Sequence, residues 1–316
     1  MGEVMPSADA RAVVIVSGGG ALTPFTTPTL ACSTDAGYLS AGNTATAMRD
    51  YLLAQGKQVF TVPTRPDWGV VDDSTSDDFG PFTGCPEVLP EHLTIMSAGD
   101  ISGGGERLAR FLHFLRTDYG ITEIDFVGHS NGGLWARSAI WVLKQTGAPI
   151  TVRSLVTVGT PHEGSVPGRF TFNEIGLDAF QGNAFAEKFN QDWVPYANAG
   201  DKGINREDTE KYLVGPGGWN AAQGSALDGI PVTLLAGTYF SEDGGDPTVW
   251  PNDATVSRSS AWAEHIPDAI MPIRTRWEAP LVHSIFTSNY AGIDWSYALT
   301  WNAESHARIN EAIDDA

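Results

Sequence analysis

The chain has 316 residues, 42% of them hydrophobic, a length and composition that suit one large α/β domain with insertions. No apolar run approaches the roughly 18 residues that a membrane-spanning helix needs, so we expect no stable membrane insertion. The formal net charge is −19, from 38 acidic against 19 basic residues, and such an acidic surface repels phosphate groups. We therefore expect neither nucleic acid nor an anionic membrane as a partner.

The two cysteines, Cys32 and Cys85, both lie in loops rich in Pro, Gly, Ser and Thr. This placement favours a disulfide in an exported protein over two buried thiols in a cytoplasmic one. Residues 1–11 are polar and show no apolar signal-peptide core, so the secretion hypothesis depends on the disulfide. The sequence leaves a cytoplasmic location open, and it leaves the oligomeric state open as well.

Short apolar strands alternate with helices along the chain. The apolar runs predict strands at 12–16, 58–62, 152–158 and 232–236. The helical patterns fall at 43–55, with Asn43 as its N-cap, and at 106–115 and 301–313. Buried strands that alternate with helices form βαβ units, so we predict an α/β fold with a mainly parallel central sheet flanked by helices.

Three stretches depart from this alternation. Residues 21–42 form an irregular loop, and residues 63–103 form a long loop whose aromatic residues suggest a packed wall near a site. Residues 166–228 carry two predicted helices, at 172–193 and 205–213, and more aromatic residues than a plain connection needs. We expect a single domain over 1–316 with 166–228 as an inserted cap, the alternative being an inert decoration of the sheet.

The most informative stretch is 124–133, which reads I-D-F-V-G-H-S-N-G-G. An apolar strand, a G-x-S-x-G turn and a helical segment follow one another, which is the context of a nucleophile elbow around Ser130. Such a turn holds its serine in a strained backbone conformation, and glycines at 128 and 132 avoid a collision with the neighbouring strand or helix. The alternative is a glycine-rich turn with an inert serine.

A nucleophilic serine needs a histidine base that is oriented by a carboxylate, and after an elbow the acid precedes the histidine in the chain. The acids that follow the strand at 232–236 are Asp243, Asp246 and Asp253. We prefer Asp253, because it lies in a Pro-Asn-Asp turn just before apolar residues, whereas the other two lie among glycines of a solvent loop.

The candidate bases are His265, His283 and His306. His265 follows the acid too closely for another element to lie between them, and His306 falls in the C-terminal helix, where we expect a surface role. His283 enters apolar chain from a loop and is our choice. His129 and His162 precede the acid, so we expect them to be structural or to lie next to the substrate.

Two backbone N–H groups must bind the oxyanion that forms during acyl transfer. Asn131, directly after the nucleophile, supplies one. The glycine run after the first strand lets the backbone approach, and we choose Gly19 there, with Gly20 as the alternative. No ligand spacing for a metal is recognised, so we expect neither a metal nor a cofactor.

With these residues in place, the chain resembles the bacterial triacylglycerol lipases and esterases of the α/β-hydrolase superfamily. Four blocks carry the resemblance: G-G-E-R-L at 104–108, the elbow at 124–133, V-T-V-G-T-P-H-E-G-S at 156–165, and N-D-A-T-V-S-R-S-S at 252–260. The resemblance implies an α/β-hydrolase fold and names Asp253 as the triad acid.

The chain also departs from that family. Ser17-Gly18 stands where the family usually has His-Gly, and Ala254 stands where it has glycine. The family often places a calcium-binding Asp two residues after its histidine, but here that residue is Ile285, so we do not transfer the calcium site.

The sequence therefore predicts a serine ester hydrolase that forms an acyl-enzyme on Ser130 and acts on an apolar or aromatic ester, such as a lipid or a polyester. A thioesterase, an amidase or a polyester depolymerase with the same triad is the first alternative. A non-catalytic relative that binds an apolar ligand is the second.

Overall fold

The computed structural model describes residues 10–33, 39–77, 80–198 and 206–316, and the polar start of the chain lies outside these ranges. A six-stranded sheet in the order β10-β9-β8-β7-β1-β2 forms the centre, and every neighbouring pair in it is parallel. Its strands are β1 (Arg11–Val16), β2 (Val59–Thr61), β7 (Glu123–His129), β8 (Thr151–Val158), β9 (Val232–Gly237) and β10 (Arg274–Ala279). The predicted mainly parallel α/β fold is confirmed.

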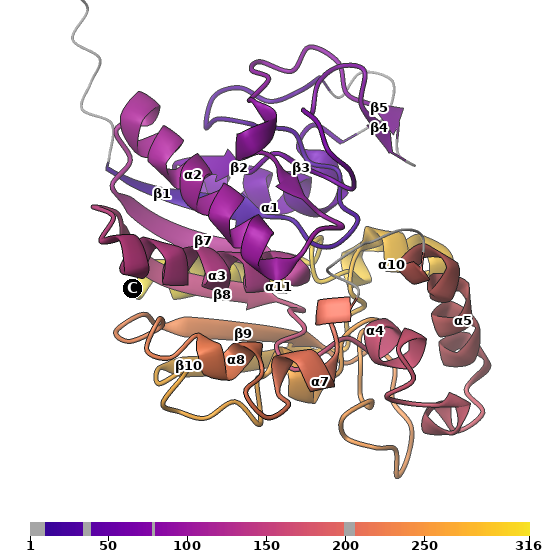
Figure 1. Cartoon of the computed structure of the whole chain (residues 1–316). Helices are drawn as coiled ribbons and strands as arrows, with labels where there is room; N and C mark the ends of the chain where they lie inside the picture. The colour runs from indigo at the N-terminus through magenta and orange to yellow at the C-terminus, as the bar shows by residue number, and fades with distance from the viewer. Residues whose placement is uncertain (1–9, 34–38, 78–79, 199–205) are drawn as a thin grey trace, which may run out of the picture.

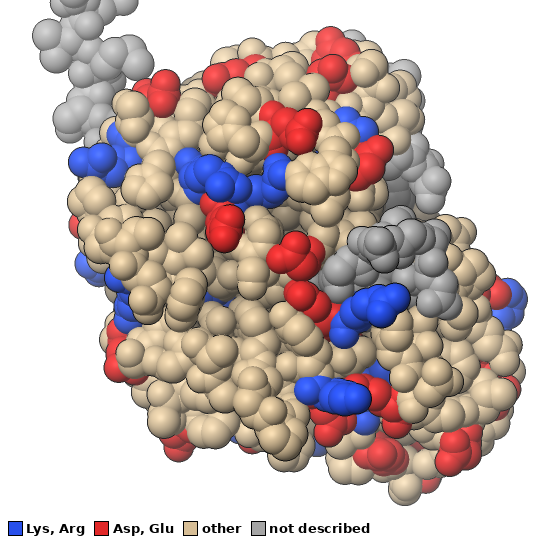
Figure 2. Space-filling model, viewed as in Figure 1, with Lys and Arg blue, Asp and Glu red and all other residues tan. Residues whose placement is uncertain are grey.

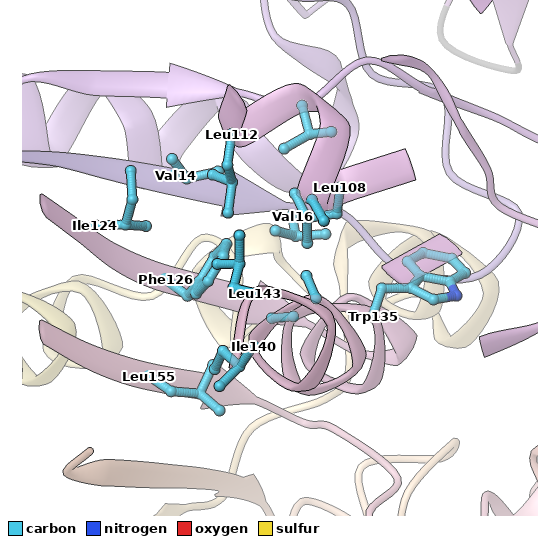
Figure 3. Close-up of a cluster of buried hydrophobic side chains, with 14 of the residues drawn as sticks. Val14, Val16, Leu108, Leu112, Ile124, Phe126, Trp135, Ile140, Leu143 and Leu155 are labelled. Atoms are coloured by element: carbon cyan, nitrogen blue, oxygen red, sulfur yellow. The ribbon is translucent and has the colours of Figure 1, made fainter. Parts of the chain in front are cut away.

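Helices cover both faces of the sheet (Figure 1). One face carries α2 (Ile101–Tyr119) and α3 (Asn131–Thr146), whose side chains pack with Val14, Val16 and Phe126 of the strands, as Figure 3 shows. The other face carries α1 (Gly42–Ala54) and α11 (Ala303–Asp314), which pack on the alternate strand residues. Because successive strand residues point to opposite faces, two apolar layers form from the same strands.

The order of the strands fixes where a site can form. From β1 the chain passes through α1 to β2 on one side, and it then returns through α2 to β7 on the other side of β1. In open parallel sheets, ligands bind beyond the carboxyl ends of the strands at such a reversal. The glycine run after β1 and the elbow after β7 therefore meet at the expected place.

Several predicted boundaries differ from the observed ones. Helix α2 begins at Ile101, earlier than predicted, because the Asp100 side chain accepts a hydrogen bond from Gly103 N–H and caps the helix. The predicted N-cap at Asn43 is wrong: α1 begins at Gly42 after Ala41, which makes no side-chain cap. Strand β10 was not predicted, because its sequence R-T-R-W-E-A is charged and mostly exposed at the edge of the sheet.

The segment 166–228 contains short elements rather than the two helices expected, and its residues 199–205 lie outside the described part of the chain. The elements are α4 (Val166–Thr171), η2 (Leu177–Phe180), α5 (Ala184–Asn198), α7 (Glu210–Leu213) and α8 (Trp219–Ala222). Glycines at 176 and 182 interrupt the predicted helix 172–193, Gly182 with φ +77°. In the described part of the second predicted helix, only residues 206–207 and 210–213 are helical.

The long loop 63–103 contains two short strand pairs and a 3₁₀ turn. The pairs are β3 (Thr64–Arg65) with β6 (Ile95–Met96) and β4 (Ser76–Asp77) with β5 (Gly80–Pro81), and the turn is η1 (Glu91–Leu93). The predicted disulfide between Cys32 and Cys85 is present and joins this loop to the loop after β1. Cys32 is buried with Leu22, Val71 and Phe82 in a small apolar cluster of its own.

The last third of the chain supplies α9 (Arg258–Ala261), α10 (Ile285–Ala291) and η3 (Trp295–Tyr297) around the carboxyl ends of β9 and β10. Within the described ranges, no helix combines the length and the apolar character that crossing a bilayer requires. Acidic and basic side chains are interspersed over the face seen in Figure 2, and most of that face is uncharged.

Candidate active site

Ser130 lies at the sharp turn between β7 and α3. Its backbone has φ 54° and ψ −135°, a conformation that non-glycine residues rarely adopt and that costs on the order of 1–3 kcal/mol. The helix begins at the next residue, so its free N–H groups and the positive end of its dipole lie beside the serine. The backbone strain that the sequence predicted at this serine is present.

The glycines of the elbow are required by contacts. A Cβ on Gly132 would lie 2.1 Å from the carbonyl oxygen of Val16 in β1, and a Cβ on Gly128 would lie 2.6 Å from Gly133 in α3. Neither glycine has a positive φ, so steric exclusion alone accounts for them. The helix can therefore start immediately behind the strand, which raises Ser130 above the sheet edge.

Asp253 is fully buried at the turn after β9. Its Oδ1 accepts hydrogen bonds from the backbone N–H groups of Thr255 (2.9 Å) and Val256 (2.7 Å), so this carboxylate oxygen is fixed by its own loop. The intervening Ala254 has φ +84°, a left-handed backbone conformation that glycine adopts at lower cost than alanine. The other oxygen, Oδ2, remains free to orient a partner.

That partner is His283. Its Nδ1 lies 2.7 Å from Asp253 Oδ2, and its backbone N–H donates to the Asp253 carbonyl oxygen at 2.9 Å. Both side chains are buried, at 7% and 1% exposure. A carboxylate on Nδ1 leaves Nε2 as the nitrogen that can accept a proton, which is the arrangement of a general base.

His129, directly before the serine, also contacts this histidine. Its Nε2 donates to the carbonyl oxygen of His283 at 3.0 Å, and the two ring centroids are 4.6 Å apart. Burial, and then the neighbouring His283, lower the pKa of His129 well below its ordinary value, so His129 is neutral at pH 7. The sequence placed His129 beside the site without predicting this hydrogen bond, which spans 154 positions.

The elbow and the His–Asp pair are joined through the end of β8. The Ser130 backbone N–H donates to Val158 at 2.9 Å. A Cβ on the next residue, Gly159, would lie 3.0 Å from both Asp253 Oδ2 and His283 Nδ1. Ser130 is thus hydrogen-bonded to the last residue of β8, and the Asp253–His283 pair packs against the residue that follows it.

The loop after β1 packs directly on the elbow. A Cβ on Gly18 would lie 3.0 Å from Ser130 Oγ, and a Cβ on Gly19 would lie 2.8 Å from the side-chain amide of Asn131. In the described part of the chain, neither Gly19 N–H nor Asn131 N–H has an acceptor. Gly20, the alternative donor, already donates its N–H to the carbonyl of Ser97, so the geometry favours Gly19.

The rejected acids and bases lie elsewhere. Asp246 is exposed and accepts hydrogen bonds from Thr248, which caps its own loop. His265 pairs with Glu163 at 2.8 Å and lines cavities of about 510 and 130 Å³, to which none of the three candidate triad residues contributes. The surface role expected for His306 is wrong: it is 5% exposed, because its ring turns inward and hydrogen-bonds Thr300.

A buried cation behind the elbow was not predicted. Arg137 of α3 is 1% exposed, its Nη1 donates to His162 Nδ1 at 3.1 Å, and it lies 4.8 Å from the ring of Trp219. Burial lowers its pKa to about 9, and burial also lowers the pKa of His162. His162 is therefore a structural link between α3 and α8, and an arginine in an otherwise apolar helix was the only sequence signal.

The described residues contain no group of three or more His, Cys, Asp or Glu side chains placed to hold a metal ion. Ile285, at the position where related enzymes often carry a calcium ligand, is completely buried.

Comparisons with known proteins found similar sequences and structures. Residues 91–181, which include the elbow, match the DUF676 family, described as a putative serine esterase. The mature form of the lipase BlEst2 from Bacillus licheniformis superimposes with a TM-score of 0.51 at 14% identity, over 98% of this chain and 94% of that one. The chain has an α/β-hydrolase fold. The fold class predicted from the sequence is confirmed.

Two curated relatives are triacylglycerol lipases. Those of Pseudarthrobacter phenanthrenivorans and Burkholderia plantarii are each 39% identical to this chain over 77 residues, 24% of its length. The matches span 23% and 20% of the two lipases, so they cover less than a quarter of either relative. The predicted resemblance to bacterial lipases and esterases is confirmed.

Proposed function

We propose that this protein is a serine ester hydrolase in which Ser130, His283 and Asp253 form a catalytic triad. The observation that carries the proposal is the buried 2.7 Å contact between His283 Nδ1 and Asp253 Oδ2, beside a serine held in a strained turn. Such a pair supplies what a serine hydroxyl lacks at neutral pH, a base that removes its proton.

In the first half of the reaction Ser130 Oγ attacks the ester carbonyl carbon, and His283 Nε2 takes the hydroxyl proton. The carbonyl oxygen becomes an oxyanion and accepts hydrogen bonds from the N–H groups of Gly19 and Asn131, with the α3 dipole behind them. The tetrahedral intermediate then expels the alcohol, which receives the proton from His283. The acyl group remains on Ser130.

In the second half water replaces the alcohol. His283 takes a proton from the water, the hydroxide oxygen attacks the acyl carbon, and the same two N–H groups bind the second oxyanion. The ester bond to Ser130 breaks, and the proton returns to Oγ as the free acid leaves. Asp253 holds the imidazole in one tautomer and stabilises the imidazolium in both halves.

The aromatic residues of 166–228 and of the neighbouring loops favour an apolar or aromatic ester as substrate. We propose that 166–228 is a cap of this single domain, because its α5 packs through Phe185 and Phe189 on Tyr290 of α10, the helix that follows His283. The disulfide between Cys32 and Cys85 supports the proposal that the enzyme acts in an oxidising, extracellular compartment.

The decisive experiment compares the wild type with Ser130→Ala on ethyl esters of graded acyl length, with thioesters and amides of the same acids in parallel. We expect turnover of esters by the wild type and a loss of about 10⁴-fold or more in kcat for the variant. An ester-active Ser130→Ala variant would exclude the triad. Wild-type turnover of thioesters or amides alone would replace the ester assignment, and binding without turnover would favour a non-catalytic relative.

A further inference from the structure

A continuous series of stacked aromatic rings crosses three separate segments of the chain. We define the aromatic ladder as Trp193, Phe189 and Phe185 of α5, Phe240 and Tyr239 after β9, and Tyr297 of η3. Tyr290 of α10 lies edge-on to its middle, 5.1 Å from Phe189. Figure 1 shows α5 and α10 side by side at the same edge of the molecule.

The rings of the ladder adopt regular stacking geometry. Phe185 stacks on Phe240 at 4.4 Å with an interplanar angle of 12°, and on Phe189 at 5.8 Å with 16°. Beyond Phe240 the rings turn edge to face: Tyr239 lies 5.0 Å from Phe240, and Tyr297 lies 6.1 Å from Tyr239. Offset stacked and edge-to-face pairs are the favoured arrangements of aromatic rings, so the ladder has a defined shape.

Part of the ladder is exposed to solvent. Its members Tyr239 and Tyr297 are 39% and 48% exposed, and the adjoining Tyr290 is 37% exposed, although each of the three rings contacts an aromatic neighbour. The other large apolar residues exposed on α5 and α10 are Tyr196 and Phe286, which are also aromatic. Among the described residues the exposed aliphatic side chains Leu30, Val88, Leu177 and Ile273 lie on other segments.

The ladder is attached to the loops that carry the acid and the base. Phe240 and Asn252 exchange two backbone hydrogen bonds, at 2.9 and 3.0 Å, and Asn252 directly precedes Asp253. Val282 N–H donates to the Tyr297 carbonyl at 2.8 Å, and Val282 directly precedes His283. A ligand stacked on the outer rings would therefore be held at a fixed place relative to the reacting centre.

We propose that the exposed rings of Tyr239, Tyr297 and Tyr290 bind an aromatic ring of the substrate, so that the enzyme prefers esters whose acyl or alcohol part carries an aryl group at a distance from the carbonyl. This inference rests on the proposed ester hydrolase function and names its substrate class. An alkyl chain gains only contact area from any apolar surface, whereas a flat ring also gains from the quadrupole of each ring on which it stacks.

The test compares two ethyl esters of similar length, ethyl 4-phenylbutanoate and ethyl octanoate, for the wild type, Tyr239→Leu, Tyr297→Leu and the double variant. Leucine keeps an apolar side chain and removes the ring. We expect the ratio of kcat/KM for the phenyl ester to that for the octanoate to fall about 3- to 10-fold for each ring removed. Tyr239→Phe and Tyr297→Phe keep the ring and should keep the wild-type ratio.

Trp141→Leu on α3 is the matched control, because Trp141 is 37% exposed and forms no part of the ladder. It should leave the ratio unchanged. An equal loss of kcat/KM on both esters, or no loss, would overturn the preference for aryl groups.

A binding experiment tests the rings without turnover. Calorimetry measures the affinity of N-ethyl-4-phenylbutanamide for Ser130→Ala and for Ser130→Ala combined with Tyr239→Leu. Weaker binding to the combined variant supports the ladder, and unchanged binding rejects it. If the wild type hydrolyses neither ester, the proposed function fails, and this binding result still decides the ladder.

Discussion

At the scale of single residues, the base is held through its backbone as well as its ring. The N–H of His283 donates to Asp253, its carbonyl accepts from His129, and its Nδ1 faces the carboxylate. These three contacts restrain the backbone and the ring of His283. If His283 is the base that we propose, His129 acts on the reaction through another residue and is a positioning residue.

Replacing His129 by Phe removes the donor and keeps a ring. We expect kcat on a short ester to fall about tenfold, the equivalent of one buried hydrogen bond, while KM changes little. His306→Phe is the matched control, because His306 is equally buried and also hydrogen-bonds a backbone carbonyl, but in α11. Steady-state kinetics and thermal melting on both variants separate the effects. A kcat that falls as much in His306→Phe as in His129→Phe would assign the loss to stability.

The glycines and the serine of the elbow were readable from the sequence, because they form one local pattern. A Cβ at 128 collides with Gly133, five positions further on, whereas a Cβ at 132 collides with Val16 of β1, so the contact that requires the second glycine is set by the tertiary structure. The burial of the His306 side chain could not be predicted from the sequence. Its burial depends on packing against Tyr51 of α1, which lies far away in the chain.

At the scale of elements, the segment 166–228 contains a carboxyl group in an unusual state. Asp208 is 8% exposed, and its Oδ1 has no hydrogen-bond partner. Burial, with a smaller contribution from Glu174, raises the pKa of Asp208 to about 8, and hydrogen bonds from Ser165 only partly offset this. At pH 7 the carboxyl group is therefore mainly protonated.

This state predicts how stability depends on pH. Between about pH 4, the ordinary value for an unfolded aspartate, and pH 8, the folded chain binds a proton that the unfolded chain does not. The free energy of unfolding should therefore receive from Asp208 a contribution that falls by about 1.4 kcal/mol per pH unit as the pH rises through this window. Asp208→Asn should remove that contribution.

Urea unfolding at several values between pH 5 and 8 measures the effect as the difference between the wild type and Asp208→Asn. The exposed Asp243→Asn is the control and should follow the wild type. If the free energy of unfolding depends on pH in the same way for the wild type and Asp208→Asn, the buried carboxyl group is ionised throughout the range.

The edge strand β10 shows why some elements escape sequence reasoning. None of its residues is fully buried, and its parallel pairing with β9 runs over six residues, from Arg274 with Val232 to Ala279 with Gly237. An edge strand has a neighbour on one side only, so its sequence is not required to be apolar, and charged residues discourage pairing with other chains.

At the scale of the whole molecule, the disulfide joins two long loops on the side of the sheet where β1 ends. It closes 53 positions of chain. The chain-entropy model assigns a loop of this length a stabilisation of up to about 4 kcal/mol, through restriction of the unfolded state.

The double variant Cys32→Ser, Cys85→Ser should therefore unfold at lower urea concentration than the oxidised wild type, with a loss of about 2–4 kcal/mol. Urea titrations with and without reductant measure it: reductant should lower the stability of the wild type toward that of the variant and leave the variant unchanged. Two free thiols in the native wild type by thiol titration would contradict the bond.

The sequence by itself determined the parallel α/β framework and the elbow, because strand and helix patterns and the strand, G-x-S-x-G and helix order are formed by residues close together in the chain. It also named Asp253 and His283, whose catalytic roles remain a prediction. Only the tertiary structure decided which groups surround them: the hydrogen bond from His129, the buried Arg137, and the aromatic ladder drawn from three segments. These contacts depend on which loops converge at the strand ends, and no local pattern encodes that convergence.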